Sequence, residues 1–180
     1  MPPRYPALMT ARTGIFVALG VGLASAVQTA MLGALGRGRA PAEAAWISLF
    51  GSIVGISALM LIRAGRGETP TLHAPLDRTW MYVLILSLGL AVLGVSLRGV
   101  PWYLGVAGLG GVLYLATAAL LVPRLGVALF FGATTAGSVI GALAVDHIGA
   151  FGAVPNPVSL ARAGGLALIL VGVVVVRVVK

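Results

Sequence analysis

The stretch "GIFVALGVGLASAVQTAMLGALG", residues Gly14 to Gly36, contains 23 consecutive residues without a charge. A spanning helix needs about 20 apolar residues to cross a hydrocarbon core of about 30 Å. The run is also longer than the apolar part of a signal peptide, which has about 7 to 15 residues. We therefore predict a helix that crosses a membrane and is retained in the chain.

The composition of the whole chain agrees with a membrane location. Of the 180 residues, 59% are hydrophobic and 9% are charged, which is too apolar for a soluble domain whose surface meets water. Twelve Lys and Arg residues against four Asp and Glu residues give a net charge of +8. Because these charges lie in short gaps between apolar runs, they indicate membrane topology and contact with anionic lipids, and no basic face for nucleic acid is seen.

Six apolar runs of spanning length follow one another along the chain. They cover approximately residues 14–36, 44–62, 79–97, 99–123, 125–145 and 158–176. Gly, Pro and charged residues mark the gaps, which are too short for a soluble domain. The sequence therefore predicts an all-α integral membrane protein, a compact bundle of six transmembrane helices with short loops in a single transmembrane domain, residues 1–180. Five spans are the alternative if residues 79–97 do not cross.

The distribution of Lys and Arg predicts the orientation of the chain. With six spans, eight basic residues lie on the side of the N-terminus and four on the other side. The eight are Arg4, Arg12, Arg63, Arg66, Arg78, Arg124, Arg177 and Lys180, and the four are Arg37, Arg39, Arg98 and Arg162. The positive-inside rule then puts both termini of a multi-pass inner-membrane protein in the cytoplasm. With five spans the count is seven against five, which is close to no preference.

Small residues recur every four positions within several runs, which puts them on one face of each helix. The residues that we expect in helix packing are Gly14, Ala18, Gly22, Gly51, Gly55, Gly110, Gly111, Gly137 and Gly141. Such stripes let helix backbones approach closely, where lipid gives no hydrophobic drive for helix association. Packing within one chain is the simpler explanation, and a subunit interface is the alternative.

Polar side chains are few within the apolar runs. Those that we predict along a substrate pathway are Gln28, Ser52, Tyr114, Thr117, Thr134 and Ser138. A polar group in hydrocarbon needs a partner, so hydrogen bonds between helices explain these residues as well as contact with a solute does. No charged residue lies in the middle of a run. Because proton relays use such groups, a proton exchanger with a central carboxylate is disfavoured.

The stretch "LAVDHIGAFG", residues 143–152, puts Asp146 and His147 at the end of the fifth run. The helix macrodipole is negative there, and Arg162 has the equally unfavourable position near the start of the sixth run. Because the loop returns the chain to the same membrane face, we predict an interfacial charge cluster in which Asp146 pairs with Arg162 and His147 lies beside them. Two solvated charges that never meet are one alternative, and a gate in which His147 titrates is another.

Residues for catalysis or metal binding are not seen in the sequence. The chain has no cysteine, which excludes disulfides, thiolate metal sites and a cysteine nucleophile. Paired carboxylates, a cluster of metal ligands and an activated nucleophile are missing too. We expect no catalytic residue, no metal and no cofactor, and therefore no enzyme.

Several stretches carry a resemblance to a known family. In the second half they are "PWYLGVAGLGGVLYL" (101–115), "LLVPRLGVALFF" (120–131), "TTAGSVIGALAVDHIGAFG" (134–152) and "LARAGGLALILVGVVV" (160–175). Together with "VQTAMLGALGR" (27–37) and "APAEAAWISLFGSIVG" (40–55), and in this order, they resemble the YdcZ-type half-length members of the drug/metabolite transporter (DMT) superfamily. The resemblance covers most of the chain outside residues 63–100.

The resemblance implies a transporter with about five helices per chain, in which two halves pair in opposite orientation around a central pathway. The chain differs from this pattern in three places. Residues 79–97 look like an extra hydrophobic segment, which would reverse the later helices relative to the first. Leu32 stands where the family usually has Asn, and Ser138 stands where it usually has Gln. Both differences remove amides, so the substrate is not carried over from the family.

Two functional hypotheses follow from these observations. The first is a small-molecule membrane transporter subunit of the DMT type, an exporter that works by alternating access as an oligomer. Its partners would be membrane lipids, a small-molecule solute, and a second copy or a homologous half. The second hypothesis is a non-transporting membrane subunit that packs against a partner membrane protein and modulates it. The sequence indicates neither the substrate nor a coupling ion.

Overall fold

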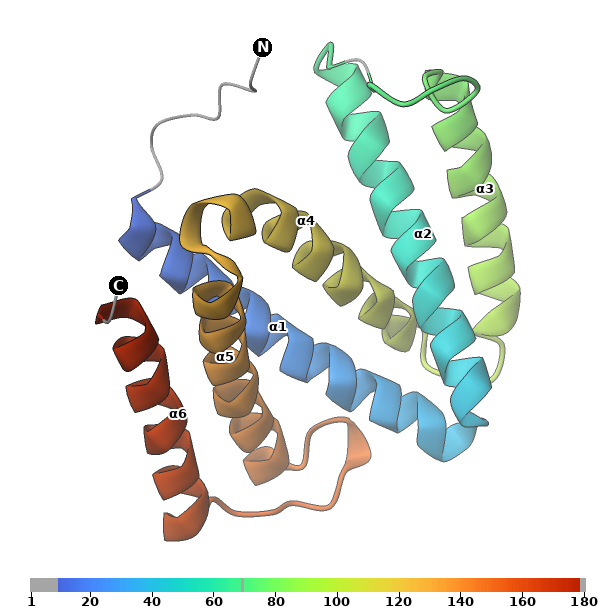
Figure 1. Ribbon diagram of the computed structural model, residues 1–180. Coiled ribbons are helices and arrows are strands. Elements are labelled where there is room, and N and C mark those ends of the chain that lie inside the picture. Colours follow the sequence, from blue (N-terminus) through green and yellow to red (C-terminus); the bar gives the residue numbers. More distant parts are fainter. Residues whose placement is uncertain (1–9, 69, 179–180) are drawn as a thin grey trace. The chain divides into compact units, whose positions relative to one another are not determined.

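The chain is built from α-helices that follow the apolar runs. The computed structural model describes residues 10–68 and 70–178, and no strand occurs in these ranges. The helices are α1 (Ala11–Gly38), α2 (Pro41–Gly65), α3 (Thr79–Ser96), α4 (Ala107–Leu125), α5 (Val127–Ile148) and α6 (Leu160–Val178) (Figure 1). Two short 3-10 helices, η1 (Trp102–Val106) and η2 (Ala150–Gly152), precede α4 and follow α5.

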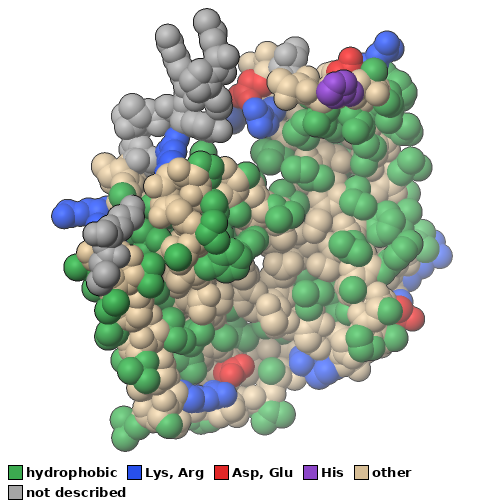
Figure 2. All heavy atoms as spheres, in the orientation of Figure 1, with side chains coloured by type: hydrophobic (Ala, Val, Ile, Leu, Met, Phe, Trp, Pro, Cys, Tyr) green, Lys and Arg blue, Asp and Glu red, His purple; other side chains and the backbone are tan. Residues whose placement is uncertain are grey.

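The surfaces of these helices are apolar. In the described part of the chain, six helices are long and apolar enough to span a membrane, η1 and α4 counting together as one. Large hydrophobic side chains lie exposed, among them Leu160 at 93%, Trp102 at 77% and Phe16 at 73%. Figure 2 shows such side chains spread over the helices, with charged side chains near helix ends. This surface is suited to lipid. The prediction of an all-α integral membrane protein with six helices of spanning length is thus confirmed.

Gly and Pro residues determine where the later helices begin. The sequence predicts a helix from residue 99, but α4 begins only at Ala107. The chain after Pro101 first forms the 3-10 helix η1. α4 then continues through Pro123 and ends two residues later. Gly126 alone separates α4 from α5, and its φ of 82° lies in a region that glycine adopts readily.

The chain divides into two compact units. Of the described residues, unit 1 contains 10–30 and 113–178, and unit 2 contains 31–112 except residue 69. α1 and α4 therefore contribute residues to both units. The single transmembrane domain expected from the sequence is not tested by this division and stays a prediction.

Unit 1 has an apolar core within its helices. The core residues are Ala18, Leu121, Leu125, Leu129, Phe130 and Ala133. Phe130 is fully buried and meets Tyr114 edge-on, with ring centroids 5.7 Å apart. α5 also packs against α6. Because lipid is as apolar as these side chains, close packing rather than removal from water stabilises this core.

α1 and α5 approach each other at the level of their backbones. A Cβ added at Gly22 would clash with the carbonyl oxygen of Thr134, and one added at Gly137 would clash with the carbonyl oxygen of Leu19. A Cβ at Gly141 would lie 2.8 Å from the Cβ of Ala26. Only residues without a side chain permit this separation, so the small-residue stripes of α1 and α5 meet within one chain.

Unit 2 repeats this kind of contact between other elements. α2 packs along α3 and against η1. A Cβ at Gly51 would lie 2.6 Å from the carbonyl oxygen of Gly105, and one at Gly108 would clash with the carbonyl oxygen of Ser48. The hydroxyl of Ser52 donates a hydrogen bond of 2.7 Å to the carbonyl oxygen of Gly108. Close backbone approach and a hydrogen bond therefore join α2 to the start of α4.

Two of the other predicted packing residues, Gly14 and Gly55, meet side chains instead of backbone. A Cβ at Gly14 would lie 3.3 Å from Leu125, and one at Gly55 would lie 2.5 Å from Leu109. Ala18 is fully buried. Gly110 and Gly111 are half-buried. In α4 the residue that meets the backbone of α2 is Gly108, which the four-residue spacing did not single out.

The backbone contact of α1 with α5 predicts that Gly22→Ala lowers the thermal stability of the protein. The new methyl group meets the backbone of Thr134, which cannot move aside as a side chain can, and such overpacking costs about 1–3 kcal/mol. Gly20→Ala on the same helix is the matched control, since no atom lies within 4 Å of its added Cβ. Thermal unfolding in detergent measures both, and equal midpoints would contradict the contact.

The charge distribution predicts that α3 crosses the membrane from the cytoplasmic to the outer face. Since the chain has no cysteine, single reporters can be introduced at Asp77→Cys before α3 and Pro101→Cys after it. An impermeant thiol reagent added to intact cells should label only the second. Labelling of both or neither would contradict the crossing, and labelling of only the first would contradict the orientation.

Of the charges that predict the orientation, Arg4 and Lys180 lie outside the described residues.

Candidate functional site

A hollow of about 360 Å³ lies within unit 1, between α1 and α5. It adjoins the backbone contact at Gly22 and Gly137, on the C-terminal side of both glycines. The lining residues are Ser25, Ala26, Thr29, Ala30, Ser138, Val139, Ala142, Val145 and Asp146. We call this feature the α1–α5 hollow. Pockets that bind small molecules have volumes of about 300–1,000 Å³, so its size suits a small ligand.

Three hydroxyl groups line the α1–α5 hollow, and each uses its proton within its own helix. Ser25 donates to the carbonyl oxygen of Val21 at 2.9 Å, and Thr29 donates to that of Ser25 at 2.9 Å. Ser138 donates to the carbonyl oxygen of Thr134 at 2.8 Å. A hydroxyl oxygen has two lone pairs besides its proton, so all three groups remain available as hydrogen-bond acceptors.

The turn that follows α5 has an unusual backbone. Gly149 caps the helix in the left-handed conformation, with φ of 62°, and Phe151 and Gly152 also have positive φ values, of 56° and 77°. A positive φ is uncommon for a bulky residue such as Phe, which marks this turn as tightly constrained. The turn brings Asn156 back to α5, where its N–H donates to the carbonyl oxygen of Asp146 at 2.7 Å.

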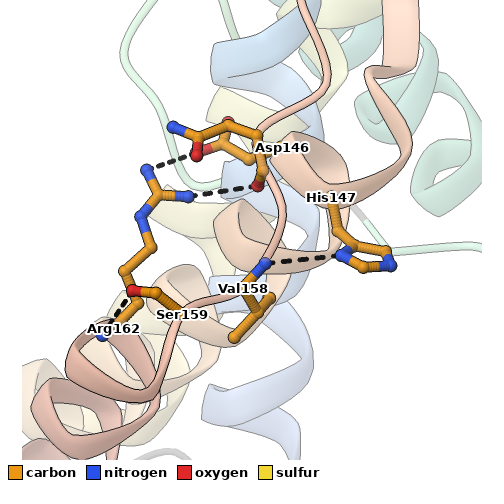
Figure 3. A network of polar contacts seen from close by, with 6 residues as sticks. Asp146, His147, Val158, Ser159 and Arg162 are labelled. Carbon is orange, nitrogen blue, oxygen red and sulfur yellow. Dashed lines mark hydrogen bonds and ion pairs between the residues drawn. The ribbon is translucent and has the colours of Figure 1, made fainter.

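An ion pair joins the end of α5 to the first turn of α6 (Figure 3). Nη2 of Arg162 lies 3.3 Å from Oδ2 of Asp146, and Nη1 of Arg162 donates to the carbonyl oxygen of Asn156 at 3.3 Å. The side chains of Asp146 and Arg162 are 44% and 34% exposed. The structure thus brings together the two charges for which the sequence suggests a pairing. The contact uses one carboxylate oxygen and is longer than the 2.7–2.9 Å of strong charge-assisted bonds, so it is a weak pair.

His147 and Ser159 complete this junction. Nδ1 of His147 accepts a hydrogen bond of 3.4 Å from the N–H of Val158. The hydroxyl of Ser159 accepts one of 3.3 Å from the N–H of Arg162 and so caps the start of α6. We call Asp146, His147 and Arg162 the α5–α6 clasp. Asp146 belongs both to this clasp and to the lining of the α1–α5 hollow.

Three of the predicted pathway residues lie in or beside the core of unit 1. Tyr114 packs against Phe130. Thr117 and Thr134 are buried, and Thr134 donates to the carbonyl oxygens of Phe130 and Phe131, each at 3.0 Å. None of these three residues lines the α1–α5 hollow.

The remaining three predicted pathway residues have different surroundings. Ser138 lines the α1–α5 hollow. Ser52 belongs to unit 2, where it bonds to Gly108. Gln28 is half-buried and makes no hydrogen bond to another described residue. The structure therefore does not gather the predicted set into one cavity.

Two residues of the hollow, Ser25 and Thr29, were not among those predicted from the sequence. Their spacing of four residues puts them on one face of α1 beside Gly22, and this pairing of a hydroxyl stripe with a glycine stripe is the signal that could have identified them. Among the residues that the structure describes, no group of three or more His, Asp or Glu side chains gathers as a metal site requires.

The sequence of the chain matches a known protein family. A sequence model of the family described as "Putative inner membrane exporter, YdcZ" matches residues 13–175. The matched range includes the α1–α5 hollow and the α5–α6 clasp. No significant match was found among curated proteins or among solved structures.

The ion pair predicts that Asp146→Asn and Arg162→Gln destabilise the protein non-additively. Each change removes the same contact, so the double variant should be less destabilised than the sum, by about 0.5–1 kcal/mol. Unfolding in detergent of the four proteins in this cycle gives the coupling. Arg177→Gln at the other end of α6 is the control partner for Asp146→Asn, and that cycle should be additive. Additivity in both cycles would remove the ion pair.

Proposed function

The chain belongs to the YdcZ family of inner-membrane exporters, of the DMT type, and from this premise we propose that it exports a small amphipathic solute through the α1–α5 hollow. The observation that carries the proposal is the hollow itself. It combines small apolar side chains with three hydroxyls and one carboxylate. Binding sites for small molecules share this combination of apolar walls and a few polar groups.

A second hollow supports transport by alternating access. It has about 370 Å³ and lies elsewhere in unit 1, where it is lined by Thr10, Ala11, Gly14, Leu121, Arg124 and Leu125. Along α1, the core residue Ala18 separates the residues of this hollow from those of the α1–α5 hollow. A solute that passes from one to the other requires the core of unit 1 to open, as a transporter does in each cycle.

The predicted orientation assigns each of the two hollows to one side of the membrane. With both termini in the cytoplasm, α1 and α5 each run from the cytoplasmic to the outer face. The α1–α5 hollow is lined by the C-terminal halves of both helices and then lies toward the outer face, whereas the second hollow lies toward the cytoplasm. An exit site on the outer face is consistent with export.

We further propose that two copies, or a copy and a homologous half, work together. None of the described residues of α6 is buried. Gly164, Gly165 and Gly172 would each accept a Cβ without meeting any atom within 4 Å. Open faces of small residues permit close approach of another helix. The same faces would suit a non-transporting subunit, but such a protein has no need of a hollow lined by a carboxylate.

The proposal predicts that Ala142→Leu reduces solute flux in proteoliposomes by about tenfold or more, which corresponds to a loss of about 1.4 kcal/mol in the interaction of the solute with the hollow. Ala142 lines the hollow, and the larger side chain fills space that the solute needs. Ala144→Leu is the matched control, because Ala144 is exposed on the same helix and does not line the hollow. The assay follows labelled small amphipathic solutes of positive, neutral and negative charge.

Equal flux through the two variants would contradict the pathway, and no flux of any solute through the unaltered protein would favour the non-transporting subunit.

The same assay tests whether two chains share one pathway. Reconstitution of unaltered chains with an excess of Ala142→Leu chains should lower the flux per unaltered chain if two chains share one pathway. A flux per unaltered chain that does not change would contradict a pathway shared by two chains.

A further inference from the structure

The side chains that line the α1–α5 hollow offer hydrogen-bond acceptors and no free donor. We infer that the hollow binds a small organic ammonium ion, with the carboxylate of Asp146 as its counter-ion and the hydroxyl oxygens of Ser25, Thr29 and Ser138 as acceptors for its N–H groups. The inference rests on the proposed function, because it names the class of solute for the same site.

The hydrogen bonds of the lining residues carry the first step. All three hydroxyl protons are held by carbonyl oxygens of their own helices, at 2.8 to 2.9 Å. The other lining side chains, apart from Asp146, are Ala and Val, which neither donate nor accept. An anion would find no side-chain donor here and would meet the charge of Asp146. A cation with N–H groups would find acceptors, one of them charged.

The geometry of the α5–α6 clasp carries the second step. Arg162 contacts Asp146 through Oδ2 alone, and Oδ1 makes no hydrogen bond or ion pair with another described residue. An arginine that grips a carboxylate firmly uses two parallel bonds. The single contact of 3.3 Å leaves one oxygen for a ligand, and Arg162 keeps its bond to the carbonyl oxygen of Asn156 when it releases Asp146. Arg162 and the ammonium ion then share one negative charge, so Arg162 weakens the binding of the ammonium ion.

The apolar part of the lining carries the third step. Ala26, Ala30, Val139, Ala142 and Val145 form the rest of the wall. They suit a compact hydrocarbon group attached to the ammonium head. An ammonium ion with an aliphatic ring therefore matches both the polar and the apolar parts of a hollow of about 360 Å³.

Three probes with the same ring and different charge test this inference. Cyclohexylamine is a cation at neutral pH, cyclohexanol is neutral, and cyclohexanecarboxylate is an anion. Isothermal titration calorimetry on the full chain in detergent should show binding of the first at least about tenfold tighter than that of the other two, because only the first pairs with the carboxylate. Equal or tighter binding of cyclohexanol or of the carboxylate, or no binding of cyclohexylamine, would overturn the inference.

Two variants separate charge recognition from a structural role of the clasp. Asp146→Asn should weaken the binding of cyclohexylamine about tenfold. Arg162→Gln should tighten it, because the internal competitor is gone while the carboxylate remains. A merely structural clasp would weaken binding in both variants, which would overturn the inference. Arg162→Gln gives this reading even if Asp146→Asn fails to fold. Glu68→Gln, which alters the ion pair with Arg63 in unit 2, is the matched control and should leave binding unchanged.

The failure of this inference is distinguishable from the failure of the proposed function. Binding at equilibrium in detergent requires no transport, whereas the comparison of Ala142→Leu with Ala144→Leu measures flux for solutes of any charge. Flux that depends on Ala142 together with no preference for the ammonium probe would overturn the inference and keep the exporter. Tight binding of the ammonium probe together with equal flux in both variants would overturn the exporter and keep the site.

Discussion

The contact between the backbones of α1 and α5 is the constraint from which the architecture of unit 1 follows. Helices in lipid gain nothing from hiding apolar side chains, so they associate through close packing. At Gly22 and Gly137 the packing leaves no space for even a Cβ. Straight helices that touch so closely at one level must diverge elsewhere, and the α1–α5 hollow is the space next to that contact. The smallest residues of α1 and α5 therefore determine where the α1–α5 hollow lies.

Hydroxyl groups make a polar lining possible in this surrounding. A free donor facing hydrocarbon would cost several kcal/mol, of order 4–8 kcal/mol for transfer into a medium without hydrogen bonds. Ser25, Thr29 and Ser138 avoid this cost because each donates to a carbonyl oxygen of its own helix. In the described ranges, no buried side-chain nitrogen or oxygen lacks a hydrogen-bond partner. The hollow thus stays stable when empty and still offers acceptors to a ligand.

The sequence predicted the elements of this protein better than their contacts. Runs without charge predict the six helices, because length and composition alone decide whether a helix can span a bilayer. The four-residue spacing marks the face of α1 whose Gly22 contacts α5, whereas in α4 the close contact with α2 is made by Gly108, one turn before the predicted Gly111. Which face of a helix meets its neighbour depends on tertiary packing, and a single sequence does not reveal that packing.

The dependence on tertiary packing also explains which residues of the site could be predicted from the sequence. Asp146 and Arg162 are rare charges on either side of one short loop, so their proximity follows from the connectivity of the chain. Ser25 and Thr29 lie on one face of α1, but Ser138 comes from α5, more than 100 residues later in the chain, and the sequence does not say that the two helices share a wall. Gln28 is predicted along the substrate pathway because of its polarity alone, and it does not line the α1–α5 hollow.

Asp146 links the hollow to the position of α6. Its carboxylate lies at the negative end of the α5 macrodipole, where a bare anion is unfavourable, so it needs a cation from some source. Arg162 supplies that charge from the first turn of α6 when the hollow is empty. An ammonium ion bound in the hollow, as inferred above, would meet the other oxygen of the same carboxylate. The two cations would then share one negative charge, so each would weaken the hold of the other. Under that inference, occupancy of the hollow would be coupled to the attachment of α6 through one shared charge, because a single contact of 3.3 Å is weak enough to loosen when a second cation binds.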